Sequence, residues 1–555
     1  MKKQVVWFTV VVFLLTSLFT GCTGKKEETT KGSTQQQTEL LTTTQETTEP
    51  PYTGGLPITS AMGTNTLTIA GFDNYDESKS LTRPVEVWTE MEKLTGIKVT
   101  FEVYPSSQYT DAMNTRIASG GKLPDIIRNP GGGDLQVVRK QNAVIDLTDL
   151  IEKYAPFTKQ FFKTDVFSFN LTKSPDGIFG LRAITMDGGV RQPYSWGIRK
   201  DWLAKLSLQE PTTTDELYNV LKAFKERDPN GNSKADEIPF VTTYGLRGVL
   251  AISNAFGLHL GTYSDGLWAE DGKVQWQYID PRAKDLLAYL NKLFTEGLLD
   301  SDCLNEDPGM DDKINQNLVG LHQSFIGNLI GYANTLKEAG VADVQYDSLI
   351  PVVNDASLKP FIERALGASA YYCITKDAKD TELAMKWLDF VYASEQGHRL
   401  TTWGIEGTSY VMKDGKPDFT DFVLKNPDGK SVNLSLMSLG ALPTVAPIIK
   451  TSEGMYSGHI ASILKGSAEL LRMGEKVAPY VVPMILLGQP TEAESKILSD
   501  LEKAGLQTYK DEMYGKFITG AESLDKFDEF VRKMKEIGAD KYVEVQQACY
   551  DRINK

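Results

Sequence analysis

The 555-residue sequence predicts an α/β fold with two lobes, and three observations support this prediction. Its folded part opens with alternating strand and helix patterns, which is typical of a largely parallel sheet covered by helices. Several later segments have apolar residues at helical spacing. About 495 residues follow the polar N-terminal segment, and a chain of that length exceeds a single compact core and suits two lobes.

The folded part begins with a predicted βαβ unit. Residues 66–70 read as a strand, residues 85–94 as an amphipathic helix and residues 98–104 as a second strand with alternating apolar side chains. Gly96 is expected to end the helix, because glycine readily adopts the left-handed conformation of a helix C-terminus. Pro105 is expected to end the second strand, because proline has no amide hydrogen for the ladder.

Further elements continue the alternation. A helix over residues 109–119 and a short buried strand at residues 126–127 predict a mostly parallel sheet with helices on both faces. Helical spacing of apolar residues then recurs over residues 213–227, 280–296, 380–394, 495–517 and 523–538.

The N-terminus has the pattern of an export signal with a lipid-attachment site. Lys2 and Lys3 precede an apolar run over residues 5–19, which is short for a permanent membrane span. Small residues then precede Cys22, so we expect residues 1–21 to be a signal peptide and Cys22 to carry a diacylglycerol, with the palmitate of a lipoprotein. Phe19 departs from the commonest lipobox residue, leucine. A soluble secreted protein cut elsewhere and an uncleaved anchor are the alternatives.

Residues 22–59 are predicted to be a disordered tether. The segment is rich in Thr, Gln, Glu and Lys, and its few apolar residues could not offset the entropy cost of ordering it. No later stretch approaches 18 uninterrupted apolar residues, so we expect a soluble body that contacts the membrane through lipid only. Anchor and tether together predict a location on the extracellular face of the cell membrane.

Charge and cysteine content narrow the possible partners. The formal charge of −14 becomes −16 once Lys2 and Lys3 are removed, and no basic stripe appears, which argues against nucleic acid. Besides Cys22 the chain has only Cys303, Cys373 and Cys549, an odd number at wide spacing. We therefore interpret these three as small buried residues and infer no disulfide framework.

Several motifs in order resemble a known family. These are residues 91–101 (MEKLTGIKVTF), 117–127 (IASGGKLPDII), 197–203 (GIRKDWL), 296–300 (EGLLD), 403–407 (WGIEG) and 516–520 (KFITG). Together they resemble extracellular solute-binding proteins of bacterial ABC importers, the family that includes maltose-binding protein, and in particular its large Gram-positive lipoprotein branch. The resemblance covers nearly all of residues 60–555.

The resemblance implies a periplasmic-binding-protein-like fold in which two α/β lobes joined by a hinge enclose a ligand in the cleft between them. We place the N-terminal lobe at residues 60–190 and 355–405, and the C-terminal lobe at residues 191–354 and 406–555. It also implies a monomer that delivers an oligosaccharide to the transmembrane subunits of an ABC permease.

Residues 228–237 match the ligand spacing of an EF-hand calcium loop. The expected ligands are the side chains of Asp228, Asn230, Asn232, Asp236 and Glu237 and the main-chain carbonyl of Lys234. Ser233 and Pro239 depart from the pattern, which has Gly at position six and a bidentate Glu at position twelve. A resemblance to loops of alginate-binding relatives implies a structural calcium ion. A polar turn after the preceding helix is the alternative.

Aromatic residues close to polar ones are candidates for sugar binding, because a pyranose has apolar faces and a hydroxyl rim. The candidates are Tyr104, Tyr194, Trp196, Arg199, Trp268, Trp403 and Glu406. The alternative is that these aromatic residues pack in the core. We favour Trp196 and Trp403 for binding, because they lie among Gly and polar residues, whereas Trp202 is in helical register with leucines.

The sequence lacks the familiar catalytic motifs. The zinc-protease helix, the nucleophile elbow and the phosphate loop are all absent from it. Paired carboxylates are plentiful in an acidic protein, so residue types alone leave a glycosidase open. The sequence favours a lipid-anchored binding protein that captures an oligosaccharide without catalysis. A surface polysaccharide-degrading enzyme and a ligand sensor for a membrane kinase are the alternatives.

Overall fold

The computed structural model describes residues 52–60, 64–73, 85–128, 135–185, 194–259, 265–364, 367–428, 432–441, 449–450 and 468–554. The predicted signal peptide, Cys22 and residues 22–51 of the predicted tether lie outside these ranges. Within the described ranges, no helix is both long enough and apolar enough to span a membrane.

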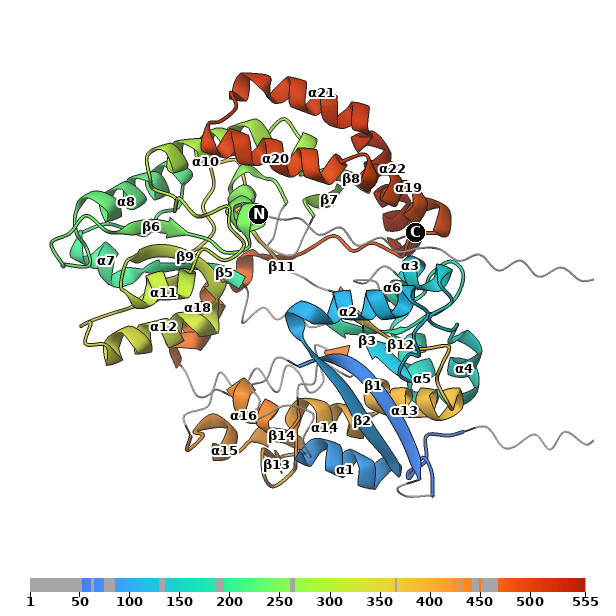
Figure 1. Cartoon of the computed structure of the whole chain (residues 1–555). Helices are drawn as coiled ribbons and strands as arrows, with labels where there is room; N and C mark the ends of the chain where they lie inside the picture. Colours follow the sequence, from blue (N-terminus) through green and yellow to red (C-terminus); the bar gives the residue numbers. More distant parts are fainter. Residues whose placement is uncertain are drawn as a thin grey trace, which may run out of the picture. The chain divides into compact units, whose positions relative to one another are not determined.

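A six-stranded sheet forms the centre of the first lobe, with the strand order β15-β4-β12-β3-β1-β2 (Figure 1). Strand β1 is parallel to both β2 and β3, whereas β12 is antiparallel to β3 and β4. The elements are β1 (Asn65–Asp73), α1 (Glu86–Thr95), β2 (Ile97–Pro105), α2 (Ser106–Ala118), β3 (Ile126–Arg128), α3 (Leu135–Lys140), α4 (Thr148–Tyr154), α5 (Pro156–Thr164), α6 (Val166–Thr172), β4 (Leu181–Thr185), β12 (Gly367–Ile374), α13 (Thr381–Ala393), α14 (Glu395–Trp403) and β15 (Ile449–Lys450).

Both faces of this sheet are buried, because successive side chains of a strand point to opposite faces. Ile126 and Ile374 pack with α1 and α13 in one core, and their neighbours Ile127 and Cys373 pack with α2 and α3 in another. Trp88 of α1 stabilises the first core by stacking on a tryptophan of α13, with ring centroids 6.3 Å apart.

A four-stranded sheet forms the centre of the second lobe, with the order β10-β5-β9-β6 (Figure 1). Strand β6 is parallel to β9, and β5 is antiparallel to β9 and β10. The elements are β5 (Tyr194–Arg199), α7 (Lys200–Lys205), α8 (Thr214–Glu226), β6 (Ile238–Val241), α9 (Gly245–Val249), the 3₁₀ helix η2 (Leu250–Phe256), α10 (Ala283–Thr295), α11 (Met310–Asn315), β9 (Val319–Phe325), α12 (Ile326–Glu338), β10 (Tyr346–Ser348) and α18 (Ala468–Val477).

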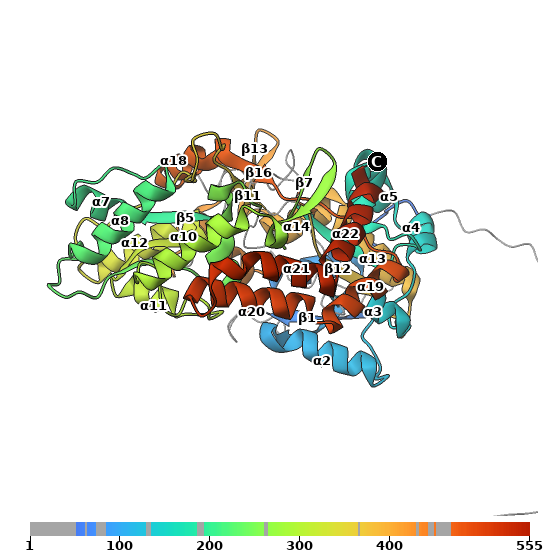
Figure 2. The ribbon, with the colours of Figure 1, turned by 90° about the horizontal axis from the view of Figure 1, so that it is seen from above.

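The C-terminal helices extend the core of the second lobe. Leu506 and Phe517 of α20 (Leu506–Thr519) are buried with the leucines of α10, and α20 runs side by side with α21 (Phe527–Ile537) (Figure 2). The remaining elements are β7 (Leu267–Glu270), β8 (Lys273–Trp276), η3 (Gln277–Ile279), β11 (Ile362–Arg364), β13 (Tyr410–Lys413), β14 (Lys416–Phe419), α15 (Asp421–Leu424), α16 (Val432–Ser438), η4 (Ala478–Tyr480), β16 (Val481–Pro483), α19 (Glu492–Lys503), α20 (Leu506–Thr519), η5 (Leu524–Lys526), α21 (Phe527–Ile537) and α22 (Ala539–Asn554).

The predicted elements are present with two differences. The helix predicted over residues 495–517 is two helices, α19 and α20, because Gly505 adopts a left-handed conformation with φ +83° between them. The first sheet is mixed rather than mostly parallel, because β12 arrives late in the chain and inserts antiparallel between β3 and β4. Cys303, Cys373 and Cys549 are buried, as predicted, and all three are free.

The lobe limits in the structure differ from the predicted ones after residue 405. Tyr410 and Phe419, expected in the C-terminal lobe, are buried in the core of the first lobe. Strand β15 also joins the first sheet, through its parallel pairing with β4. Conversely, Ile362 packs in a core of the second lobe, and β11 pairs with β16. Burial of these apolar side chains, rather than chain order, therefore determines which lobe each segment joins.

Candidate functional site

Exposed aromatic side chains lie at the carboxyl edge of the second sheet. Phe325 is the last residue of β9 and is 43% exposed, and Tyr244 follows the parallel strand β6 and is 41% exposed. Parallel strands end at the same edge of a sheet, and open α/β sheets bind ligands outside this edge. Two large aromatic residues that remain exposed there are therefore candidates for ligand contact.

The carboxyl edge of the first sheet has a matching aromatic group. Phe72 at the end of β1 is the register partner of Tyr104 at the end of β2, and both rings contact Tyr109 edge-on. The guanidinium of Arg128, at the end of β3, lies 4.0 Å from the centre of the Phe72 ring. The Tyr109 hydroxyl donates to the Arg128 carbonyl oxygen at 2.6 Å, and its burial raises the pKa of that phenol.

We call these two groups the strand-edge site, consisting of Phe72, Tyr104 and Arg128 in the first lobe and Tyr244 and Phe325 in the second. Flat rings beside a guanidinium suit a sugar, whose ring faces are apolar and whose rim forms hydrogen bonds. Only Tyr104 was among the sequence candidates. The sequence contained a signal for both residues, since Phe325 ends a buried strand, Tyr244 follows one, and each directly precedes a helix with a nearby Gly.

The tryptophan candidates are buried. Trp403 has no exposed surface and packs against Phe419 with ring centroids 4.4 Å apart. Trp196 packs edge-on against Phe240 in the core of the second lobe. Trp268 is buried beneath His259, with the rings parallel and 5.3 Å apart. Burial gives these rings a packing role in this structure, and their contact with a ligand stays a prediction.

The remaining sequence candidates lie in different settings. Arg199 is 1% exposed, and its Nε and Nη2 donate to both carboxylate oxygens of Asp201 at 2.9 and 2.7 Å. This bidentate pair gives the guanidinium a structural role. Glu406 is exposed in a turn of the first lobe. The backbone of Tyr194 is the register partner of Phe325, which places Tyr194 next to the strand-edge site but not in it.

The EF-hand-like loop folds around the side chain of Asp228. Its Oδ1 accepts from the amides of Gly231 and Asn232 at 2.8 and 3.1 Å, and its Oδ2 accepts from Ser233 at 3.0 Å. Ser233 has φ +60°, so it adopts the left-handed conformation for which an EF-hand uses glycine. The serine at position six is thus compatible with the turn of a calcium loop.

Two further features test whether the residues of the loop fit a cation. The Nδ2 of Asn232 donates to both oxygens of Asp236, at 3.0 and 3.1 Å, so a metal would need this amide to turn its oxygen inward. Glu237 is buried, and neither carboxylate oxygen has a hydrogen-bond partner. Burial raises the pKa of Glu237 and the charges of Asp228 and Asp236 add to this shift, whereas the nearby backbone amides of Glu237 itself and of Asn230 oppose it.

An unpartnered buried carboxylate beside two others is a feature that a cation would stabilise. Within the described ranges, no group of three or more His, Cys, Asp or Glu side chains is already arranged to hold a metal ion. A calcium ion in this loop would also need amide and main-chain oxygens as ligands. The Nδ2 of Asn230 also donates to Asp236, at 3.2 Å. The residues therefore fit calcium in chemistry, and binding would require the amides of Asn230 and Asn232 to reorient.

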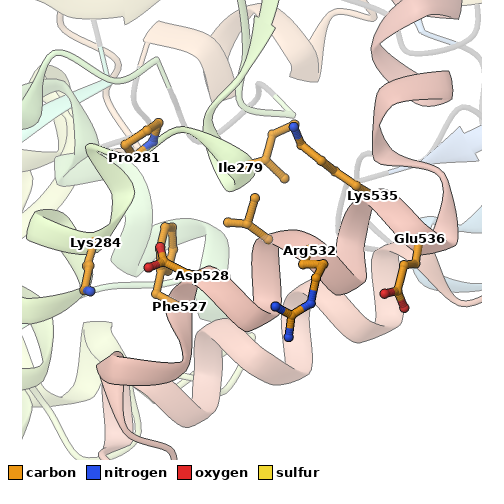
Figure 3. Close-up of a pocket in the computed structure, with 9 residues that line it drawn as sticks. Ile279, Pro281, Lys284, Phe527, Asp528, Arg532, Lys535 and Glu536 are labelled. Carbon is orange, nitrogen blue, oxygen red and sulfur yellow. The ribbon is translucent and has the colours of Figure 1, made fainter.

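One pocket, of about 660 Å³, lies between α21 and the start of α10 (Figure 3). Its apolar wall is formed by Ile279, Pro281, Phe527 and Val531. The charged side chains around it, which include Asp528, Arg532 and Glu536, are not buried. This pocket therefore lacks the buried polar groups that orient a ligand.

The comparison with known families agrees with this geometry. The model of the bacterial extracellular solute-binding protein family matches residues 75–398, more than half of the chain. The chain therefore belongs to this family of two-lobed binding proteins, and it is a solute-binding protein rather than an enzyme. The predicted two-lobed α/β fold is confirmed.

The chain is similar to three proteins along most of its length. The fructooligosaccharide ABC transporter substrate-binding protein FusA of Streptococcus pneumoniae is 27% identical over 83% of this chain and 86% of its own length. Lipoprotein LipO of Bacillus subtilis is 26% identical over 83% and 88%. The crystal structure of the alginate-binding protein AlgQ2 without calcium ion superposes with a TM-score of 0.70, at 25% identity over 89% of this chain and 99% of that one.

Proposed function

We propose that this protein is anchored by lipid to the outer face of the cell membrane, captures an oligosaccharide and delivers it to an ABC permease. The observation that carries the proposal is the strand-edge site, where Phe325 and Tyr244 remain exposed at the ends of parallel strands. The similarity to FusA, a fructooligosaccharide-binding protein, supports an oligosaccharide as the ligand class.

A thermal-shift screen against fructooligosaccharides, alginate oligomers and pectin fragments tests the ligand class. A ligand that binds only the folded state raises its stability by about 2.7 kcal/mol at a hundredfold excess over Kd. Phe325→Ala should weaken binding of the best ligand by about tenfold, because a sugar–aromatic contact is lost. Val166→Ala, which removes an exposed apolar side chain on α6, is the matched control. Equal affinity in both variants would contradict a ligand role for Phe325.

We further propose that residues 228–237 bind a structural calcium ion. Asp228, Asn230, Asn232, Asp236 and Glu237 would supply side-chain oxygens, and Lys234 its carbonyl oxygen. The buried, unpartnered carboxylate of Glu237 supports this proposal, because a divalent cation would compensate its charge. The loop follows α8 directly, so an ion there would fix the end of this helix and stabilise the second lobe rather than contact the ligand.

Chelation tests the calcium proposal. EDTA should lower the melting temperature, and the double variant Asp228→Ala, Asp236→Ala should melt at the same temperature with and without EDTA while keeping its sugar affinity. The matched control is Asp355→Ala, which removes an exposed turn aspartate elsewhere in the chain. A melting temperature of the wild type that is indifferent to EDTA would identify the loop as a polar turn.

The lipid anchor rests on the signal-like N-terminus and Cys22, and the similarity to lipoprotein LipO supports it. Cys22→Ser should remove the attachment and release the protein into the medium. Metabolic labelling with a palmitate analogue should mark the wild type and not the variant. If the variant stays in the membrane fraction, the apolar N-terminal segment is an uncleaved anchor.

A further inference from the structure

A second pocket, of about 720 Å³, shares no lining residue with the strand-edge site. Its wall is built mainly by α19, α20 and α22 of the second lobe, with Gln136 and Lys140 of α3 from the first lobe. The pocket volume is in the range of about 300–1,000 Å³ typical of small-ligand sites. We call it the helix-junction pocket.

Buried polar side chains distinguish this pocket from the one in Figure 3. Ser495 is only 7% exposed, and its hydroxyl has no hydrogen-bond partner. Gln546 and Lys510, both 9% exposed, also face the pocket. A buried hydroxyl without a partner is costly, and a ligand that bonds to it would remove this cost.

Four of the six charged side chains around the pocket already form ion pairs with one another. Its lining has three cationic and three anionic side chains, which are Lys140, Arg247, Lys510, Asp265, Glu502 and Asp511. Arg247 lies 3.6 Å from Asp265, and Lys510 lies 3.1 Å from Asp511. The Lys510 ammonium also lies 4.1 Å from the ring centre of Tyr278, while its burial lowers the pKa of this amine.

This pairing selects against charged ligands. An anion that binds at Arg247 or Lys510 would have to compete with an existing ion pair and would leave its partner unneutralised, and the same holds for a cation at Asp265 or Asp511. A hydroxyl group can donate to a carboxylate and accept from an ammonium or amide at the same time. A ligand with many hydroxyl groups can therefore bind here without breaking either pair.

From these contacts we infer that the helix-junction pocket is a second binding site, specific for a neutral saccharide of one or two rings. Ser495 and Gln546 would bond to its hydroxyl groups, and Tyr542, also in the wall, supplies an aromatic surface. The inference does not depend on the proposed ligand of the strand-edge site, because the two sites share no residue.

Occupancy of this pocket would connect the two lobes. The Nε2 of Gln136 donates to the carbonyl oxygen of Pro490 at 3.4 Å, so α3 already contacts the segment that leads into α19. A saccharide between Gln136 and α20 would add hydrogen bonds across the same junction. Binding here should therefore stabilise the contact between α3 and the C-terminal helices.

Calorimetric titration of the full chain with sucrose, maltose and cellobiose at millimolar concentration tests the inference. Gln507→Trp fills the pocket from α20 and should abolish binding at this site. Thr508→Trp, on the exposed side of the same helix, is the matched control and should bind as the wild type does. Ser495→Ala, which removes only the unpartnered hydroxyl, should weaken binding about fivefold.

The outcome separates this site from the strand-edge site. Disaccharide binding that Gln507→Trp abolishes and Phe325→Ala leaves intact supports the helix-junction pocket. Absence of binding to the wild type overturns the inference, as does binding that Phe325→Ala abolishes and Gln507→Trp leaves unchanged. If charged digalacturonate binds in the pocket and the neutral disaccharides do not, the proposed ligand class is wrong.

Discussion

Asp389 on α13 provides a sharp test of the electrostatics of the first lobe. Its side chain has no exposed surface, and its two oxygens accept from the amides of Thr158 and Phe157 at 2.6 and 3.3 Å. These amides belong to the first turn of α5, whose partial positive charge favours the carboxylate. Burial disfavours the carboxylate and outweighs these contacts, so the pKa of Asp389 is raised from 3.8 to about 6.

The raised pKa determines the sign of the pH dependence. Between the unfolded and folded pKa values the folded state binds a proton that the unfolded state has lost, so stability falls as the pH rises through this window. A shift from 3.8 to about 6 corresponds to about 3 kcal/mol of folding stability. This stability is present below the unfolded pKa and is fully lost above the folded pKa. Asp389→Asn cannot titrate and loses one amide acceptor worth ~1 kcal/mol. At neutral pH the variant should therefore be about 2 kcal/mol more stable than the wild type.

Urea unfolding followed by circular dichroism, at a series of pH values from acidic to neutral, measures this difference. All other titrating groups are shared, so the stability difference between the two proteins isolates Asp389. The difference should grow in favour of Asp389→Asn as the pH rises. The matched control is Asp149→Asn, an exposed site on α4, which should show no such trend. If the wild type becomes more stable relative to Asp389→Asn as the pH rises, the hydrogen bonds from the amides of α5 outweigh the effect of burial, and the reasoning is refuted.

Three further predictions concern buried groups. Gly197→Ala should destabilise the second lobe by about 1–3 kcal/mol in urea unfolding, because the added Cβ would lie 2.3 Å from a methyl carbon of Leu329. Arg199→Met should lower the free energy of unfolding by about 3 kcal/mol, because it leaves a carboxylate without its guanidinium partner. Unchanged sugar affinity of this variant would confirm a structural role for Arg199, and lost affinity would indicate a ligand contact. Cys303 and Cys373 should resist maleimide in the native protein, as measured by mass spectrometry, because both are buried and burial raises the pKa of Cys303 to about 12.

The sequence predicted those parts of the fold that local pattern controls. The helix that ends at Gly96 and the following strand are present, because both depend on spacing within a short window. Segments that pack far from their sequence neighbours were harder to assign. Tyr410 lies in the first lobe and β12 inserts antiparallel into the first sheet, and both placements depend on contacts with distant segments. Such contacts produce no periodic pattern of apolar residues in the sequence.

The site residues illustrate the same division. Trp196 and Trp403 were favoured for their Gly-rich and polar neighbours, yet a large ring contributes most to stability when it is buried, and both are. Phe325 and Tyr244 remain exposed because they lie where strands end, beyond the helices that cover the sheet. Position relative to a strand end therefore indicates better than residue type which aromatic side chains stay exposed in this fold. That rule needs only a predicted parallel strand and the residues at its carboxyl end, both of which a sequence can supply.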